Sequence, residues 1–297
     1  MRALCQQFYD YSLSIRGYSK DTIKRYKHTI DFFCKFANIT DINQVSVENV
    51  RALFLNGRSK RNWTVSTYLV YYRSLTVFFR WCISQGFMTE KNPVPDIEKP
   101  RVEKTLPKKL TQQDTIRLLE IIDNYPWQNK FLRYRNHAMF ATFLFTGIRK
   151  QELLKLKYTD MDIENLSVFV KNGKGNKDRI VPMSPSLAVI LKKYLEERSK
   201  LKKTCPEFFV SLHRNTGLTY AGLRSIAITM RRVSKIDFSI HKLRHSFACM
   251  MIQSGCDIYS LSKLMGHSDI STTAIYLSAS ADHLRSQMTK HPLNDLV

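Results

Sequence analysis

The sequence predicts a mainly α-helical protein that contains one small antiparallel β-sheet and is divided into two domains. Apolar residues recur at helical spacing along most of the chain. Two short β-type runs, SVFVK and DRIVPM, flank a glycine-rich turn in the second half. Between the halves, KNPVPDIEKPRVEKTLPKK has the proline and charge content of a linker. We therefore expect a helical domain over residues 1–98, a basic linker over 99–108 and a second domain over 109–297.

The first domain should consist of helices. Ser19 can cap a helix whose apolar positions repeat at helical spacing and whose other face carries lysine and arginine. Ser46 begins a second helix, and Thr64 begins a longer one that stops at Gly86. The segment NGRSKRNW, which precedes Thr64, is polar and basic.

The second domain should be helical apart from the two strands. Thr111 and Asp114 in LTQQD resemble a capping box at the start of a helix, and helical patterns follow to about Lys157. After the two β-type runs, the remainder of the chain is again helical in pattern.

A helix that starts near His241 would have one apolar side and one polar side, at about 100° per residue. The apolar side holds Leu243, Phe247, Met250 and Met251, and the opposite side holds His241, Arg244, His245 and Ala248. We expect the apolar side to pack inward, so that two histidines and an arginine share a polar rim.

The net charge of the chain favours one class of binding partner over others. The 297 residues include 47 lysines and arginines against 25 acidic residues, which gives a formal net charge of +22. Such an excess attracts a polyanion over long range and speeds association with it. Nucleic acid is the expected partner; a membrane-surface protein and a merely basic enzyme are the alternatives.

The six cysteines form no C-x-x-C pair, so we expect them to be reduced and mostly buried. The N-terminus lacks the apolar region of a signal peptide, and no apolar run approaches the roughly 20 residues that span a bilayer. We expect a soluble cytoplasmic protein, associated with the nucleoid and not with a membrane.

Two local patterns that would suggest a cofactor do not fit. HKLRH has Lys242 where the zinc helix H-E-x-x-H needs its glutamate, and a cation there opposes metal binding. The turn GKGNK matches neither G-x-x-x-x-G-K-[ST] nor G-x-G-x-x-G. We therefore expect no metal ion, nucleotide or other cofactor.

The second domain contains five short sequence motifs in a particular order. They are FTGIRKQELLKLK (145–157), GKGNKDRIVP (173–182), HKLRH (241–245), LMGH (264–267) and Tyr276. In this order they resemble the tyrosine recombinases, the integrase family of DNA strand-exchange enzymes. The helical first domain resembles that family's core-binding domain. Each motif alone also fits an ordinary helix, hairpin or half-buried tyrosine, and we find no strong departure from the family pattern.

The resemblance implies a phosphoryl-transfer site. Tyr276 would attack a DNA phosphodiester and form a covalent 3′-phosphotyrosyl link. Arg149 and Arg244 match the two family arginines, whose planar guanidinium groups bond phosphate oxygens bidentately. His267 would donate a further hydrogen bond, and His241 would also donate or help to remove the attacking proton. We expect the surrounding cations to favour the phenolate form of the nucleophile.

Further residues complete the expected site. Lys174, on the turn between the strands, matches the family lysine that protonates the departing 5′-oxygen, and Lys177 is the alternative. Glu152, in the family's R-x-x-E-L pattern, should orient Arg149 or fix the helix. His245, on the same rim of its helix, is a supporting residue.

Double-stranded DNA recombination sites are the implied partner. Contacts of lysine and arginine with phosphates should supply most of the affinity and make it salt-dependent. We expect the segment 56–63, the helix over 64–80 and a later arginine-bearing helix to read the major groove. The candidate contact residues are Lys60, Arg61, Arg73, Arg231 and Arg232. The C-terminal tail should dock on a neighbouring protomer and give a homo-tetramer on synapsed DNA.

The biological role is left open by the sequence. The helical domain begins almost at residue 1, which leaves no room for an arm-type DNA-binding domain. We therefore expect an Xer-like recombinase or a small integrase, invertase or resolvase of a mobile element, with accessory proteins or DNA topology giving direction. The alternatives are a nicking-closing enzyme like the type IB topoisomerases and a catalytically silent DNA-binding protein.

Overall fold

The computed structural model describes residues 1–101, 109–171, 178–267 and 269–276. Contacts between Cα atoms divide the chain into two units, Met1–Lys104 and Thr105–Val297. Both units are mostly helical, and a three-stranded antiparallel sheet lies in the second. The predicted fold class is confirmed. No helix in the described part of the chain is long and apolar enough to cross a membrane.

The predicted helix starts in the first unit are confirmed. Ser19, Ser46 and Thr64 each accept a hydrogen bond from the backbone N–H three residues ahead. Thr111 does the same for Asp114 in the second unit, where the carboxylate also accepts from the Thr111 hydroxyl at 2.9 Å. These caps are local, which explains why the sequence alone identifies them.

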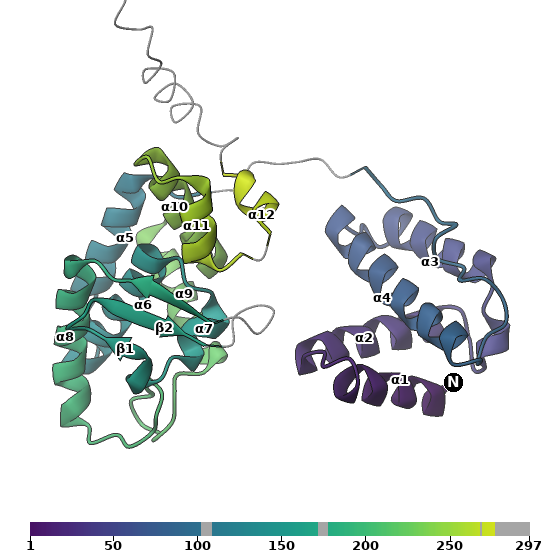
Figure 1. The fold of residues 1–297 in the computed structure, drawn as a ribbon, viewed down its shortest axis with the longest axis horizontal. Helices are drawn as coiled ribbons and strands as arrows, with labels where there is room; N and C mark the ends of the chain where they lie inside the picture. The colour runs from purple at the N-terminus through teal and green to yellow at the C-terminus, as the bar shows by residue number, and fades with distance from the viewer. Residues whose placement is uncertain (102–108, 172–177, 268, 277–297) are drawn as a thin grey trace, which may run out of the picture. The chain divides into compact units, whose positions relative to one another are not determined.

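An aromatic core holds together the first unit, whose helices are labelled α1 to α4 in Figure 1. The side chains of Phe8, Phe33 and Phe78 are almost completely buried, and the rings of Phe8 and Phe78 meet edge-on at 5.2 Å. Helix α2 packs against α1 and α4. The helices are α1 (Arg2–Ser14), α2 (Lys20–Phe36), α3 (Val47–Ser59) and α4 (Val65–Ser84), with a 3₁₀ turn η1 (Ile42–Gln44).

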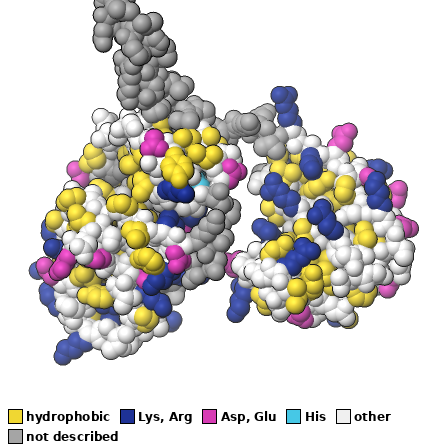
Figure 2. All heavy atoms as spheres, viewed as in Figure 1, with side chains coloured by type: hydrophobic (Ala, Val, Ile, Leu, Met, Phe, Trp, Pro, Cys, Tyr) yellow, Lys and Arg dark blue, Asp and Glu magenta, His cyan; other side chains and the backbone are white. Residues whose placement is uncertain are grey.

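Lysine and arginine are prominent on the surface of the first unit, as Figure 2 shows for one face. A hollow of about 740 Å³ lies against α4 and is lined by Arg58, Arg73 and Arg101 together with small and aliphatic residues of that helix. This hollow combines positive charge with a concave shape.

In the second unit, α6 (Lys130–Thr146) is the central helix (Figure 1). It is buried around most of its circumference and packs against α5, α8 and α10. The other helices are α5 (Gln112–Asn124), α7 (Lys150–Lys155), α8 (Pro185–Lys200), α9 (Tyr220–Ser234), α10 (Ile240–Gln253), α11 (Ile258–Met265) and α12 (Ser271–Ala274), with a 3₁₀ turn η2 (Tyr158–Asp160).

The sheet has the order β1 (Met161–Asp162), β2 (Ser167–Val170), β3 (Arg179–Pro182). The two predicted strands are confirmed to within one residue, whereas β1, two residues long, was not predicted. Val170 pairs with Arg179, and Val168 with Val181. The valines face the core, so the alternation of a strand directs the Arg179 side chain inward as well.

The predicted division of α10 into an apolar inward side and a polar rim is wrong at several positions. His241 is exposed, but Arg244 is 4% exposed and Ala248 is fully buried, while the predicted core residues Met250 and Met251 are only half-buried. The reason is tertiary: both α6 and α11 pack against α10 and enclose it from more than one side. The arginine is therefore a buried cation rather than a solvated one.

Candidate active site

The turn between α6 and α7 brings the first arginine into the site. Gly147 ends α6 in a left-handed conformation, with φ +60°, and a Cβ atom there would collide with the ring of Phe247. Two residues later, Arg149 occupies the N-cap position of α7. Glycine is therefore required for both the turn and the close packing that place this arginine.

Glu152 fixes Arg149 at two points. Its Oε1 atom accepts from Nη1 of Arg149 at 2.7 Å, and its Oε2 atom accepts from the Arg149 backbone N–H at 2.9 Å. The side chain of Glu152 is 5% exposed. Burial raises the pKa of this carboxyl, but hydrogen bonds and charges from Arg179 and Arg149 outweigh it and lower the pKa to about 2.

The second arginine enters from α10. Arg244 donates from Nη1 to the carbonyl of Gly147, and from Nη2 to the carbonyl of Met265 at 2.6 Å and to His267 at 3.0 Å. Burial and then the nearby charge of Arg149 lower its pKa to about 9, so it stays charged at neutral pH. These hydrogen-bond partners are uncharged or basic, while the carboxylate of Glu152, which Arg149 and Arg179 also contact, favours the charged form of Arg244 through its negative charge.

His267 follows α11, whose last turn ends at Gly266 with φ +63°. Its Nδ1 atom lies 2.8 Å from the hydroxyl of Thr273. Because a guanidinium group can only donate, Nε2 of His267 accepts from Arg244, and the ring proton lies on Nδ1. In this state the ring does not offer a proton from Nε2.

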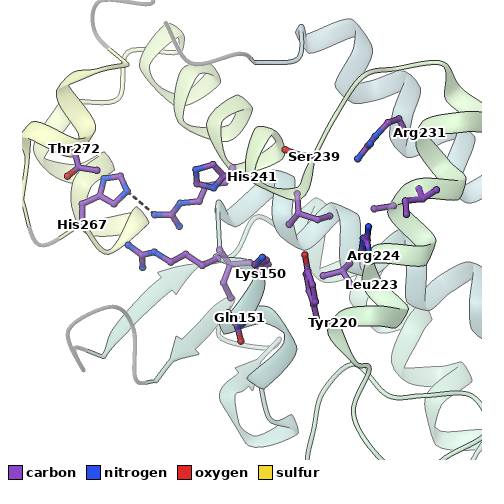
Figure 3. Close-up of a pocket in the computed structure, with 16 residues that line it drawn as sticks. Lys150, Gln151, Tyr220, Leu223, Arg224, Arg231, Ser239, His241, His267 and Thr272 are labelled. Carbon is purple, nitrogen blue, oxygen red and sulfur yellow. Dashed lines mark hydrogen bonds between the residues drawn. The ribbon is translucent and has the colours of Figure 1, made fainter. Parts of the chain in front are cut away.

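These side chains share one pocket of about 670 Å³. Arg149, Arg244, His241 and His267 line one part of it, and Figure 3 shows the two histidines near one another at one end. Burial and then the charge of Arg244 lower the pKa of His241. The pocket continues along α9, where its lining includes Tyr220, Leu223, Arg224, Ile228 and Arg231.

Tyr276 lies next to this pocket but is not among the residues that line it. The side chain is 2% exposed, packs with Phe247 and Leu261, and places its hydroxyl 2.6 Å from Nδ1 of His245. Burial raises the pKa of the phenol to about 12, and Arg244 opposes this only in part. The expected effect of the cations is present, since Arg244 lowers the pKa of the phenol, but burial outweighs it in this conformation.

His245 contacts both the phenol and a histidine of the pocket. Its ring centroid lies 4.3 Å from that of His241, which lines the pocket, and 5.5 Å from that of Tyr276. Burial, and then the charges of His241 and Arg244, lower the pKa of His245 to about 4. A neutral imidazole beside a protonated phenol can accept its hydroxyl proton in a hydrogen bond.

Comparison with known proteins identifies the family. Residues 108–283 match the phage integrase family, and residues 4–87 match the N-terminal SAM-like domain of phage integrases. The chain is 34% identical to the tyrosine recombinase XerD of Listeria monocytogenes over 289 residues, which are 93% of this chain and 94% of that protein. The chain belongs to the tyrosine recombinase family.

Two further likenesses agree with this assignment. The recombinase is 31% identical to the tyrosine recombinase XerC of Oceanobacillus iheyensis, over 96% of this chain and 94% of that one. The fold of this chain is also similar to that in a crystal structure of the XerH site-specific recombinase bound to palindromic difH substrate. The TM-score is 0.75 and the sequence identity is 21%, over 96% of this chain and 84% of the other. The recombinase is thus a tyrosine-type site-specific recombinase, and the topoisomerase and silent-binder alternatives are not favoured.

The structure brings together Arg149, Arg244, His241 and His267, with Glu152 and His245 in contact with members of the group. Lys174 and Lys177 lie outside the described residues. All five candidate DNA-contact residues are exposed, namely Lys60, Arg61, Arg73, Arg231 and Arg232. Arg73 lines the hollow of the first unit, and Arg231 lines the pocket.

Sequence reasoning missed residues of the recombinase site. Tyr220 and Arg224 line the pocket, and the ammonium group of Lys150 lies 4.4 Å from the Tyr220 ring centroid. Arg179 contacts Glu152 directly. A signal existed for Arg179 in particular: strand alternation from Val181 places it on the inward face.

Proposed function

We propose that this recombinase cuts and rejoins specific sites in double-stranded DNA, with Tyr276 forming a 3′-phosphotyrosyl link to the cut strand. The observation that carries this proposal is the convergence of Arg149, Arg244, His241 and His267 on one pocket beside Tyr276. Two fixed guanidinium groups and two imidazoles match the shape and charge of a phosphodiester.

The charges in the site favour an incoming anion. Glu152 lies between Arg149 and Arg179, whereas buried Arg244 hydrogen-bonds to carbonyl groups and His267. The positive charge of these three arginines therefore exceeds the single negative charge of Glu152. A phosphate in the pocket would supply the balancing charge, and the same cations would stabilise the further negative charge of the transition state.

The chemistry is a transesterification. The Tyr276 oxygen bonds to phosphorus, the bond from phosphorus to the 5′-oxygen breaks, and the departing oxygen takes a proton from Lys174, with Lys177 as the alternative donor. We propose that His241, which lines the pocket, accepts the phenol proton or donates to the phosphate. Because the energy of the phosphodiester is kept in the covalent link, a second attack by a 5′-hydroxyl rejoins the strand without ATP or a metal ion.

Tyr276 is not arranged for this attack in the structure. The Tyr276 hydroxyl is bonded to His245 and the phenol is buried outside the pocket lining. Nε2 of His267 accepts from Arg244, so it must be freed or protonated before it can donate to phosphate. We propose that DNA binding moves Tyr276 from His245 into the pocket and supplies the anion that releases His267.

The partner is double-stranded DNA, contacted by both units. The net charge of +22 supports this, as do the exposed positions of Lys60, Arg61, Arg73, Arg231 and Arg232. We propose that four copies assemble on synapsed DNA through the C-terminal tail, residues 277–297, which lie outside the described residues. Accessory proteins would give the reaction its direction, and an enzyme of this kind would work at the nucleoid.

An Xer-like role is the better supported of the two biological roles. The relatives named XerD and XerC match more than nine-tenths of both chains. A small integrase, invertase or resolvase of a mobile element is the second role. The two are separated by the DNA site that the protein selects from random duplexes.

The proposal is tested with DNA that carries a nick beside the cleavage site, which traps the covalent complex. Wild-type protein should form the adduct in the presence of EDTA and yield recombinant product from intact sites, whereas Tyr276→Phe should do neither. An adduct that forms with Tyr276→Phe, or that requires a metal ion, contradicts the mechanism. Supercoil relaxation without recombinant product would instead indicate a nicking-closing enzyme.

A further inference from the structure

We propose that Arg179 is a positioning residue for the recombination reaction, which holds the Arg149–Glu152 pair against the C-terminal end of α11. It would set the place of the phosphate-binding arginine without touching DNA. This inference rests on the proposed function, because the rate it affects is that of the phosphotyrosyl step.

The contacts of Arg179 face the protein and not the pocket. Its Nη1 and Nη2 atoms donate to Oε1 and Oε2 of Glu152 at 3.0 and 2.8 Å, and its Nε atom donates to the carbonyl of Leu264 at 3.0 Å. The side chain is 10% exposed and is not part of the pocket lining. Such a bidentate pair fixes orientation as well as distance.

Glu152 is thereby shared between two arginines. Each of its oxygens accepts one hydrogen bond from Arg179 and one from Arg149, either from the guanidinium group or from the backbone N–H. With four hydrogen bonds, the carboxylate is close to its full accepting capacity. If Arg179 were lost, the carboxylate would keep contacts with Arg149 alone and could rotate with it.

Three arginines meet at the end of α11. The carbonyls of Leu264, Met265 and Gly266 accept from Arg179, Arg244 and Arg149 respectively. These carbonyls form the negative end of a helix, where cations are stabilised. The C-terminal end of α11 therefore helps to position all three guanidinium groups. His267 follows this end directly.

Close packing supports the same view. A Cβ atom on Gly266 would lie 2.8 Å from Nη1 of Arg179, so the guanidinium group occupies the space that a side chain would need. Arg179 is also the first residue of β3, five residues after Lys174 in the sequence. The Arg179 side chain thus connects the first residue of β3 with the first turn of α7 and with the C-terminal end of α11.

Single-turnover cleavage of the nicked substrate at saturating DNA is the measurement that tests this role. Arg179→Gln should slow formation of the adduct by about 100-fold, the loss expected from a displacement of about 1 Å at a reacting group. DNA affinity should stay at the wild-type value, and Arg179→Lys should restore part of the rate. Arg133→Gln is the matched control, because Arg133 makes a similar two-bond pair with Asp123.

A double-mutant cycle separates positioning from general stability. If Arg179 acts through Arg149, Arg179→Gln should slow cleavage much less in an Arg149→Lys background than in the wild type. Equal losses in both backgrounds, or a wild-type rate for Arg179→Gln at saturating DNA, overturn the inference. Each variant is scored on its folded fraction, determined by thermal unfolding.

The two proposals fail in different ways. If wild-type protein forms no adduct, the proposed function fails. If the wild type forms the adduct and Arg179→Gln forms it equally fast, only the role of Arg179 is refuted.

Discussion

At the scale of single residues, Glu152 supplies a negative charge to the arginines of the site. It is a buried carboxylate that accepts hydrogen bonds from two arginines, one of which lines the pocket. Burial alone would make it costly, yet Arg179 and Arg149 hold its pKa at about 2. Glu152 therefore stays ionised at neutral pH.

Replacing Glu152 by Gln should lower the free energy of unfolding by about 3 kcal/mol at pH 7, because two partly buried arginines lose their counter-ion. The folded pKa of Glu152 lies below its ordinary 4.5, so its stabilising effect is present above pH 4.5 and is lost as the pH falls towards 2. Urea unfolding at pH 7 and pH 3 measures this. The gap between the two proteins should narrow at pH 3, and an equal gap at both values would contradict the account.

Tyr276 shows the limit of sequence reasoning at this scale. The motif order indicated its place near Arg244 and His267; in the structure Arg244 acts on the phenol through its charge, and the hydroxyl contacts His245. Its hydrogen bond to His245 and its raised pKa depend on burial in a cluster with Phe247 and Leu261, which sequence spacing cannot show. The Arg179 contact with Glu152 is of the same kind, since its partners lie far apart in the chain.

Among the secondary-structure elements, helix ends determine the geometry of the site. Gly147 and Gly266 end α6 and α11 with positive φ, and both carbonyls accept from arginines of the site. N-caps such as Ser46 and Thr111 were predictable because a few neighbouring residues determine them. The surroundings of α10 were not, because α6 and α11 pack against it.

Gly266→Ala should impair cleavage much more than its backbone strain alone would. The new Cβ atom would lie 2.8 Å from Nη1 of Arg179, in addition to the cost of about 1 kcal/mol for alanine at positive φ. Gly255→Ala is the matched control, because Gly255 has φ +89° with no atom within 4 Å of its Cβ position. Both variants should lose thermal stability, but only Gly266→Ala should also slow adduct formation at saturating DNA. Similar cleavage rates for the two would show that this contact is unimportant.

For the whole molecule, composition and pattern predicted the mainly helical fold, and two β-type runs predicted β2 and β3. The strand β1 was missed because two residues carry no periodicity. Both the charge excess and the motif order were properties of the full chain and needed no coordinates. The pocket along α9, in contrast, depends on how Tyr220 and Arg224 approach Lys150 in three dimensions.

The excess of positive charge should make DNA binding steeply dependent on salt. With about 6–10 phosphate contacts, affinity should fall by about 10³ to 10⁵ between 50 and 200 mM salt. Arg73→Gln should reduce the slope of log affinity against log salt by about one. Lys200→Gln is the control, because Lys200 is already paired with Glu197. A wild-type slope for Arg73→Gln would remove Arg73 from the DNA contacts.

The central claim is that the phosphorus of one DNA phosphodiester becomes bonded to residue 276. The covalent complex formed on nicked DNA can be digested with nuclease and trypsin and mapped by mass spectrometry. The nucleotide should be found on peptide 264–285, whose one tyrosine is Tyr276, with the linkage through a 3′-phosphate. A nucleotide on a different peptide, or attached through a 5′-phosphate, would contradict the account.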